Sequence, residues 1–229
     1  MTQADTTPTP STPRRRNPAA TKEKLIRSAL ELFTTVGFHG STTPQIASNA
    51  NVAEGTIYRH FSGKSHMFNE IYRGAVRLYA RIFDDTDEMA NCRKRLETIA
   101  RHWFALASRD AHIAMLVLVM PVNRLLDEES RILRARFTGR LGKIMASGKS
   151  DGMVRPGSAE VWADVWLQLI SLAVERITAG GWGPDDDYVG QVIDAAWKAI
   201  CSDIPAQRPL TSAPLANKAP SGSYKMRRS

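Results

Sequence analysis

The chain has 229 residues, of which 43% are hydrophobic and 24% charged, the ordinary composition of a globular protein with a core. Cys92 and Cys201 are far apart and form no Cys-x-x-Cys pair, which predicts free thiols in a reducing cytoplasm rather than a disulfide framework. The longest apolar run, Ile113 to Val122, contains Pro121 and is too short to span a bilayer, and no secretory signal is expected.

The net charge of +8 is spread unevenly along the chain. Residues 1–82 carry a net charge of +6, residues 83–204 carry −3, and residues 205–229 carry +5. Such asymmetry indicates contact with nucleic acid at one end of the molecule. Charge alone leaves a second interpretation open, in which two basic disordered tails flank a nearly neutral protein.

Both ends of the chain are predicted to be disordered and basic. Residues 1–16 are rich in Thr and Pro and end on Arg14, Arg15 and Arg16, which form either a solubilising flank or an arm to phosphates or a minor groove. Residues 205–229 are rich in Pro, Ala and Ser, and a tail of this kind adds non-specific affinity for DNA.

The next segments predict four helices. The first begins at Asn17-Pro18, an N-cap followed by proline, and stops at Gly37, where glycine suits a left-handed conformation. The second covers 42–50 and opens with a capping box in which Gln45 reciprocates the cap of Thr42. Asn51 suits the turn because Asn tolerates positive φ. The third and fourth helices are expected at about 54–61 and 64–83.

Helical periodicity continues beyond the fourth helix, and no segment alternates like a half-buried strand. Helix-breaking residues divide the chain beyond the fourth helix, among them Pro121, Pro156-Gly157 and Gly180-Gly181. The sequence therefore predicts an all-α protein of about nine helices, the last five at roughly 92–108, 111–119, 122–148, 158–179 and 185–202.

Two stretches carry a family resemblance. Leu30 to Gly37 and Thr42 to Lys64 resemble the N-terminal domain of the tetracycline-repressor (TetR) family of transcriptional regulators, through Ile46-Ala47, Gly55-Thr56-Ile57-Tyr58, His60-Phe61 and Lys64. The match covers roughly residues 18–70. It implies a three-helix helix-turn-helix domain at 17–63 (TetR-type domain about 18–78, reading motif 42–61). An effector-binding and dimerisation domain, a helical bundle, is then expected at 64–204.

The resemblance also implies which residues meet DNA. Ile57 and Phe61 are four apart and point inward, so Gly55, Tyr58 and Arg59 face outward. The alternative for each residue is an ordinary solvated position. Asn51, Ala53 and Glu54 depart from the family pattern, so the base preference is not readable. The expected DNA-binding residues are Thr42, Thr43, Gln45, Glu54, Gly55, Thr56, Tyr58, Arg59, His60 and Lys64.

In the resembled family the last two long helices pair with those of a second copy, which predicts a homodimer through 158–179 and 185–202. An intramolecular core is the alternative use of these apolar faces. The family also binds a hydrophobic small-molecule effector in the larger domain, where bulky apolar side chains with a few polar groups suit a pocket. For each candidate, a place in the core is the stronger interpretation. The candidates are His102, Trp103, Phe104, Met115, Met120, Trp162, Trp166, Gln168 and Glu175.

Together these features predict a ligand-responsive repressor in the cytoplasm, which binds a palindromic operator in double-stranded DNA as a dimer and is released by its effector. A DNA-binding accessory regulator that senses no small molecule is the alternative. The chain has no phosphate-binding Gly-rich loop, no His-Glu-x-x-His and no Gly-x-Ser-x-Gly, so an enzyme is not expected. No cofactor, metal, catalytic residue or membrane partner is predicted.

Overall fold

The computed structural model describes residues 18–202, so the predicted leader and tail lie outside the described residues. Helices dominate this part of the chain, where an isolated β-bridge joins Val154 and Cys201. The predicted all-α fold is therefore confirmed. The elements are α1 (Pro18–Thr35), α2 (Gly37–Gly40), α3 (Thr43–Asn49), the 3₁₀ helix η1 (Glu54–Arg59), α4 (Lys64–Asp85), α5 (Cys92–Arg109), α6 (Ala111–Ala114), the π-helix η2 (Met115–Val119), the 3₁₀ helix η3 (Asn123–Leu125), α7 (Glu128–Ser150), α8 (Ala159–Thr178) and α9 (Asp187–Ile200).

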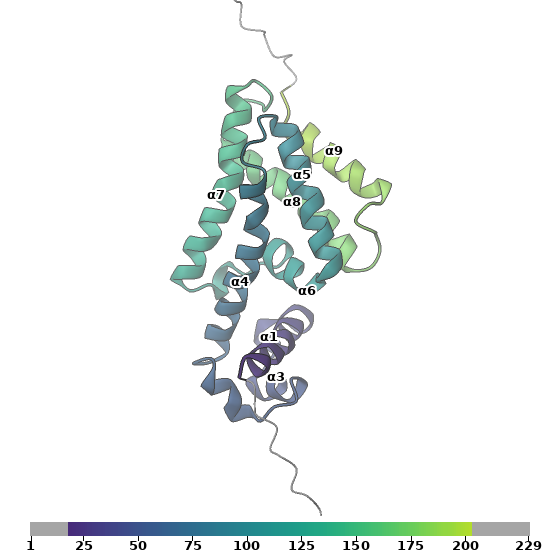
Figure 1. Cartoon of the computed structure of the whole chain (residues 1–229). Helices are drawn as coiled ribbons and strands as arrows, with labels where there is room; N and C mark the ends of the chain where they lie inside the picture. Colours follow the sequence, from purple (N-terminus) through teal and green to yellow (C-terminus); the bar gives the residue numbers. More distant parts are fainter. Residues whose placement is uncertain (1–17, 203–229) are drawn as a thin grey trace, which may run out of the picture.

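The elements from α1 to η1 form a small unit, here called the head, at one end of the molecule (Figure 1). Three aromatic side chains pack at its junction with α4, since Phe33, Phe38 and Phe68 lie with ring centroids 5.3–5.6 Å apart. Ile46 of α3 and Ile57 of η1 are fully buried in the core of the head. Burial of these side chains, rather than helix propensity, stabilises helices as short as α3 and η1.

The elements from α5 to α9 form the second unit, here called the bundle, and α4 runs from the head into it (Figure 1). Helix α8 is central and packs against α5, α7 and α9. Trp103 is completely buried at the centre, with its ring 5.8 Å from that of Phe83, 5.5 Å from Phe137 and 6.0 Å from Trp166. Its Nε1 donates to the carbonyl oxygen of Tyr79 at 3.0 Å, so the indole is satisfied within the core.

Several local predictions are confirmed. Gly37 has φ +84° and ends α1, and Asn51 has φ +55° in the turn between α3 and η1. Thr42 and Gln45 form the predicted capping box. Ala53 precedes η1 without a side-chain cap, as its methyl side chain requires.

Three predicted helices differ in detail. The helix expected at 122–148 begins only at Glu128, because Asp127 caps it and the preceding Asn123–Leu125 is a 3₁₀ turn. The helix expected at 54–61 is a 3₁₀ helix that ends at Arg59. The segment 111–119 is one turn of α-helix followed by a π-helix, in which Met120 N donates to Met115 O at 2.8 Å. Among the described helices none is both long and apolar enough to cross a membrane.

Candidate nucleic-acid interface

The N-terminus of α3 is built by Thr42 and Gln45. The Gln45 backbone N donates to Thr42 Oγ1 at 3.3 Å, while Gln45 Oε1 accepts from the Thr42 backbone N at 2.9 Å and from Thr42 Oγ1 at 3.0 Å. These bonds use both acceptor positions of the Gln45 amide oxygen. The exposed Gln45 side chain can therefore offer a neighbouring molecule only its NH₂ donors.

Helix η1 presents its outward face beside this terminus. Tyr58 is 56% exposed, whereas Ile57 is fully buried and anchors the helix. The Thr43 hydroxyl lies 3.5 Å from the Tyr58 hydroxyl and 3.4 Å from Glu54 Oε1, both at the long limit for a hydrogen bond. These weak contacts join the start of α3 to η1 on one exposed surface. The turn at Asn51, where φ is +55°, thus brings the interface candidates of α3 and η1 together.

A hollow of about 620 Å³ lies in the head, between the start of α1 and η1. Three predicted interface residues, Thr56, Arg59 and His60, line it. Thr21 and Lys24 of α1 line it too, although sequence reasoning gave them no role. Their position in the sequence could have indicated a role, because both lie in the first turns of the helix that follows the three arginines.

Lys64 begins α4 and is held inside the head. Its Nζ donates to the carbonyl oxygens of Phe38 and Ser41, each at 2.7 Å, and lies 4.4 Å from the centre of the Phe38 ring. The ammonium therefore fixes the turn before α3. These bonds use two of its three N–H donors.

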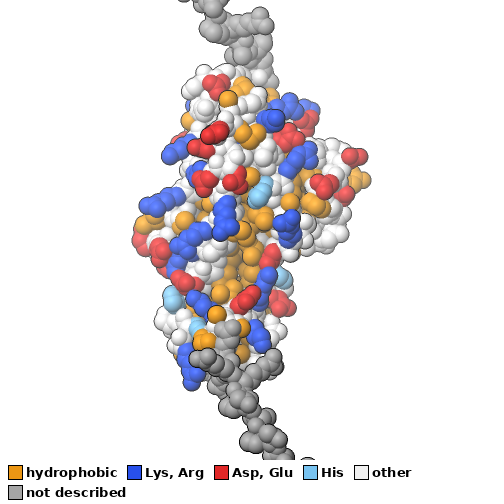
Figure 2. Space-filling view, viewed as in Figure 1, with side chains coloured by type: hydrophobic (Ala, Val, Ile, Leu, Met, Phe, Trp, Pro, Cys, Tyr) orange, Lys and Arg blue, Asp and Glu red, His pale blue; other side chains and the backbone are white. Residues whose placement is uncertain are grey.

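Gly55 is exposed, and a Cβ added there would meet no heavy atom within 4 Å. An alanine would therefore fit the head, and any restriction on this position must come from a molecule outside it. On the face of the bundle seen in Figure 2, Lys/Arg and Asp/Glu side chains are interspersed. A polyanion such as DNA would favour a surface of one sign, which this face of the bundle does not offer.

The effector candidates are spread through the bundle. Trp103, Phe104 and Trp166 are buried at its centre, and Gln168 and Glu175 are exposed on α8, so the structure does not bring these two groups together. Trp166 also lines a hollow of about 150 Å³ between α5, α8 and α9, together with Leu96, Ile193 and Trp197. The remaining candidates, all half-buried, are His102, Met115, Met120 and Trp162.

Two of these half-buried side chains have polar partners. The Met115 sulfur accepts from the Thr178 hydroxyl at 3.3 Å, and Trp162 Nε1 donates to the Pro156 carbonyl oxygen at 3.2 Å. Both contacts hold ends of α8 in place. Within residues 18–202, no three His, Cys, Asp or Glu side chains are placed to hold a metal ion.

Comparison with known proteins agrees with this geometry. The family model "Bacterial regulatory proteins, tetR family" matches residues 25–71, which include the whole of α3 and η1. The regulator TcmR of Streptomyces glaucescens is 30% identical over 158 residues, 63% of this chain and 70% of that protein. The fatty acid metabolism regulator protein of Bacillus subtilis is 26% identical over 138 residues, 58% of this chain and 71% of that protein.

A solved structure supports the same fold across both units. The crystal structure of AibR in complex with isovaleryl coenzyme A and operator DNA superposes with a TM-score of 0.64 at 18% identity, covering 78% of this chain and 97% of that one. At this identity the likeness shows the fold alone. The family model matches the head, and TcmR aligns with most of the chain at 30% identity. This protein therefore belongs to the TetR family of DNA-binding transcriptional regulators.

Proposed function

We propose that the protein is a repressor that binds a palindromic operator as a homodimer and leaves it when a hydrophobic small molecule binds the bundle. The observation that carries the proposal is the exposed surface of the head on which α3 and η1 bring the Thr43 and Tyr58 hydroxyls within 3.5 Å of each other. A short helix with exposed polar groups at the end of a molecule fits the major groove. The bundle, at the opposite end of the molecule, is then free to bind a second copy of the chain and a small-molecule effector.

In this proposal Tyr58, His60 and the helix termini bind backbone phosphates, and the remaining outward groups read bases. Arg59 supplies a cation beside the hollow, and Thr56 offers a hydroxyl and a methyl group. Gln45 acts only as a donor, because its oxygen is used in the capping box. Glu54 accepts from a cytosine amino group or stays in solvent.

The homodimer is proposed to form through α8 and α9. Val161 and Leu172 of α8 and Tyr188 of α9 are exposed large hydrophobic side chains, at 53%, 42% and 58%. A second copy would cover them, and an isologous contact would place two heads on one side of DNA. Spacing of the heads by one helical turn, about 34–36 Å, suits a palindrome.

For the effector we infer a compound with an acyl chain as the first class to test. Two similar proteins support this class, since one relative is a fatty acid metabolism regulator and AibR, which shares the fold, was solved with isovaleryl coenzyme A. A specific observation favours the alternative of a regulator without an effector. The centre of the bundle is filled by Trp103, Phe83, Phe137 and Trp166, whose rings are in contact.

The test begins with duplexes selected from a random pool by the full chain. Fluorescence anisotropy then measures affinity for the selected duplex with and without isovaleryl coenzyme A and longer acyl thioesters. A palindromic consensus, a dimer by light scattering and release by one thioester are the expected results. A monomer on an asymmetric site would contradict the proposal, whereas a dimer that no compound releases would favour the alternative.

A matched pair of variants tests the assigned surface. Arg59→Ala removes a cation of the head, and Arg136→Ala removes an exposed cation of α7. Arg59→Ala is expected to lose about tenfold in DNA affinity and to lower the salt slope by about one, and Arg136→Ala to change neither. Equal losses in both variants would argue that DNA contacts are not confined to the head.

A further inference from the structure

Helix α4 connects the head to the bundle and packs against both. Near its start Phe68 packs between Phe33 and Phe38 of the head, with ring centroids 5.4 and 5.3 Å away. Near its end Tyr79 and Phe83 pack against Trp103 of the bundle. The direction of the head relative to the bundle is therefore set by whatever holds the middle of α4.

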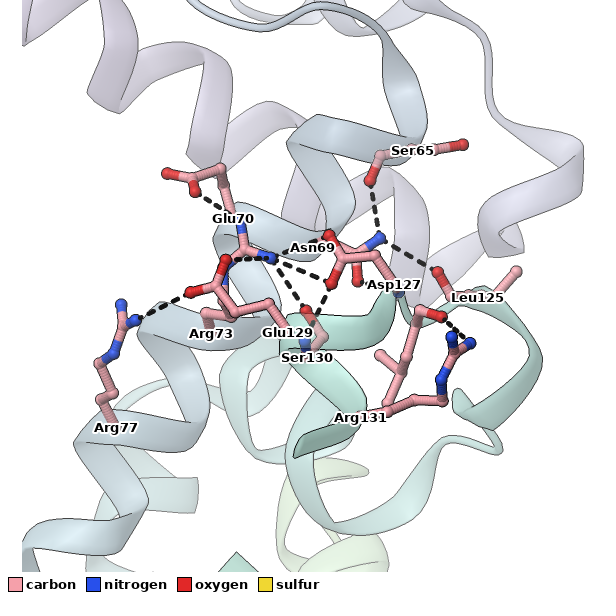
Figure 3. A network of polar contacts seen from close by, with 11 residues as sticks. Ser65, Asn69, Glu70, Arg73, Arg77, Leu125, Asp127, Glu129, Ser130 and Arg131 are labelled. Carbon is pink, nitrogen blue, oxygen red and sulfur yellow. Dashed lines mark hydrogen bonds and ion pairs between the residues drawn. The ribbon is translucent and has the colours of Figure 1, made fainter. Parts of the chain in front are cut away.

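The middle of α4 is held by Arg73, which is 5% exposed although it is charged (Figure 3). Its Nη1 donates to both carboxylate oxygens of Asp127, at 3.1 and 2.9 Å, and to Ser130 Oγ at 3.1 Å. Its Nη2 donates to Glu70 at 2.6 Å. A buried guanidinium satisfied in this way is a stiff connection, because breaking it leaves an uncompensated charge.

Asn69, one turn earlier on α4, holds the same segment through the backbone. Its Nδ2 donates to the Leu125 carbonyl oxygen at 3.1 Å, and its Oδ1 accepts from the Asp127 backbone N at 2.9 Å. Asp127 is also the N-cap of α7, since its carboxylate accepts from Ser130 N at 2.9 Å. One aspartate thus starts α7 and binds α4.

A second aspartate has the same double role where α1 of the head meets α6 of the bundle. Asp110 is the N-cap of α6, accepting from Ile113 N at 3.2 Å, and it pairs with Arg27 of α1. Beside it, Thr34 Oγ1 lies 2.6 Å from His112 Nδ1. The Arg27 side chain is 62% exposed, so water and salt screen this pair in a way that they do not screen Arg73.

The two aspartates mark the ends of one segment, residues 110–127, which contains α6, η2 and η3. Between the ends, the π-helix η2 contacts α8, because Ser171 Oγ donates to the Leu118 carbonyl oxygen at 2.7 Å. The segment therefore connects α8 with both aspartates. π-Helices are rare and are often found at functional positions.

We propose that Asn69, Arg73 and Asp127 form a fixed contact between α4 and the start of α7, here called the pivot, and that the contact of Arg27 and Thr34 with Asp110 and His112 is the weaker of the two and opens first. Arg73 and Asp127 are then positioning residues for DNA binding without touching DNA. The part that concerns release by an effector rests on the proposed function. The pivot itself is a property of the free protein.

The test compares Asp127→Asn with Asp110→Asn in the full chain. The pair is matched, because asparagine caps a helix as well as aspartate does, and each variant removes only the charge that binds an arginine. Hydrogen–deuterium exchange is measured without DNA or effector. Asp110→Asn is expected to speed exchange about tenfold in residues 27–40 and 110–114 and to leave 64–77 protected. Asp127→Asn is expected to speed exchange in 64–77 and 125–131 as well.

Salt gives a second measurement on the unaltered protein. At about 1 M NaCl, exchange in the α1–α6 contact should approach that of Asp110→Asn, while 64–77 keeps its protection. Loss of protection in 64–77 at high salt or in Asp110→Asn, or its retention in Asp127→Asn, would overturn the pivot. Arg73→Lys keeps the charge but makes fewer hydrogen bonds, so its exchange rate in 64–77 should lie between those of the unaltered protein and Asp127→Asn. This variant provides the test if Asp127→Asn does not fold.

Affinity for the selected duplex separates positioning from stability. At a temperature where circular dichroism shows every protein folded, Asp127→Asn is expected to bind about tenfold more weakly, with Arg73→Lys intermediate. Unchanged affinity in folded Asp127→Asn would show a merely structural role. The exchange experiment uses neither DNA nor effector. Its result can therefore contradict the pivot without contradicting effector-controlled repression, and a failed repression experiment leaves the pivot intact.

Discussion

Gln45 folds back on Thr42 so that its amide oxygen accepts two hydrogen bonds, at 2.9 and 3.0 Å, from the residue that caps its own helix. An adenine is usually recognised by both ends of a Gln or Asn amide at once. The capping box therefore removes half of that recognition from Gln45. A residue that supports the helix in this way can contribute to DNA binding only through its nitrogen.

Gln45→Glu separates these two roles. Glutamate keeps an acceptor oxygen for the capping box, so the free energy of unfolding should change by less than about 0.5 kcal/mol. The variant loses the NH₂ donors and places a negative charge at the surface proposed to meet DNA, so affinity for the selected duplex should fall about tenfold. Urea denaturation and fluorescence anisotropy measure the two effects.

Thr42→Ala is the complementary variant, because it removes the cap and is expected to cost about 1 kcal/mol of stability. Thr42→Ser keeps the hydroxyl and serves as its control. Undiminished DNA affinity in Gln45→Glu would place this end of α3 away from the interface.

Gly148 of α7 is a packing constraint that can be tested by adding one methyl group. A Cβ at this position would lie 2.7 Å from Cys92 Sγ and 2.7 Å from Val154 Cγ2, both in buried residues. Gly148→Ala should therefore lower the free energy of unfolding by about 1–3 kcal/mol through overpacking. Urea denaturation measures the change.

Gly139 of the same helix is the matched control. It is exposed, and an added Cβ would meet no heavy atom within 4 Å. Gly139→Ala should raise the free energy of unfolding by about 0.5–1 kcal/mol, since glycine is a poor helix former. A shift of the same sign in both variants would contradict the close contact at Gly148.

Cys92 is expected to be chemically inert in the folded protein. Burial, reinforced by the charge of Asp151, raises the pKa of its thiol to about 11, and the side chain is 3% exposed. The thiolate is the reactive form, so iodoacetamide at pH 7–8 should label the half-buried Cys201 and spare Cys92. Mass spectrometry should find one modified cysteine in the native protein and two in urea.

The control for this measurement is Cys201→Ser, in which the native protein should take up no label. Rapid labelling of Cys92 in that variant would mean that the packing between α5 and the end of α7 opens readily. The Sγ contact to the Ile144 carbonyl oxygen, 3.7 Å, belongs to that packing.

Much of the fold follows from local signals in the sequence. Gly37, Asn51 and the Thr42–Gln45 box each act within a few residues of their own position, and each has the predicted conformation. The start of α7 also had a local signal, because Asp127 is followed by Glu128 and Glu129 in a first turn. The predicted helix begins too early because its start is placed directly after the breaker Pro121.

Other features depend on contacts between distant residues and have no local signal. Lys64 binds carbonyl oxygens 26 and 23 residues away, and Arg73 binds a carboxylate 54 residues away. Periodicity shows neither partner. For the same reason, Trp103 and Gln168 could not be separated as effector candidates until the burial of one and the exposure of the other were known.

Acid should weaken the contact of α4 with α7. A hydrogen bond from Arg73 holds the pKa of Glu70 below its usual range. Burial alone would raise the pKa of Asp127, but hydrogen bonds from Ser130 and Arg73 outweigh it and leave that pKa lowered too. Both carboxylates therefore bind protons less readily in the folded chain than in the unfolded one.

The consequence for stability has a definite sign. Since the unfolded chain takes up protons first, the contribution of these carboxylates is complete above their unfolded pKa values, about 4, and is lost as pH falls through the lower folded values. The free energy of unfolding from urea denaturation should thus decline from about pH 5 downward. Asp127→Asn should flatten this decline, because it removes one of the two groups.

Glu128→Gln is the control for the acid experiment. Glu128 lies next to Asp127 and pairs with Arg131 at 2.7 Å, but its side chain is 74% exposed, and such pairs add little stability. The variant should keep the acid dependence of the unaltered protein. If Glu128→Gln flattens the decline as much as Asp127→Asn does, the acid response comes from general charge at the start of α7 and not from the carboxylates that bind Arg73.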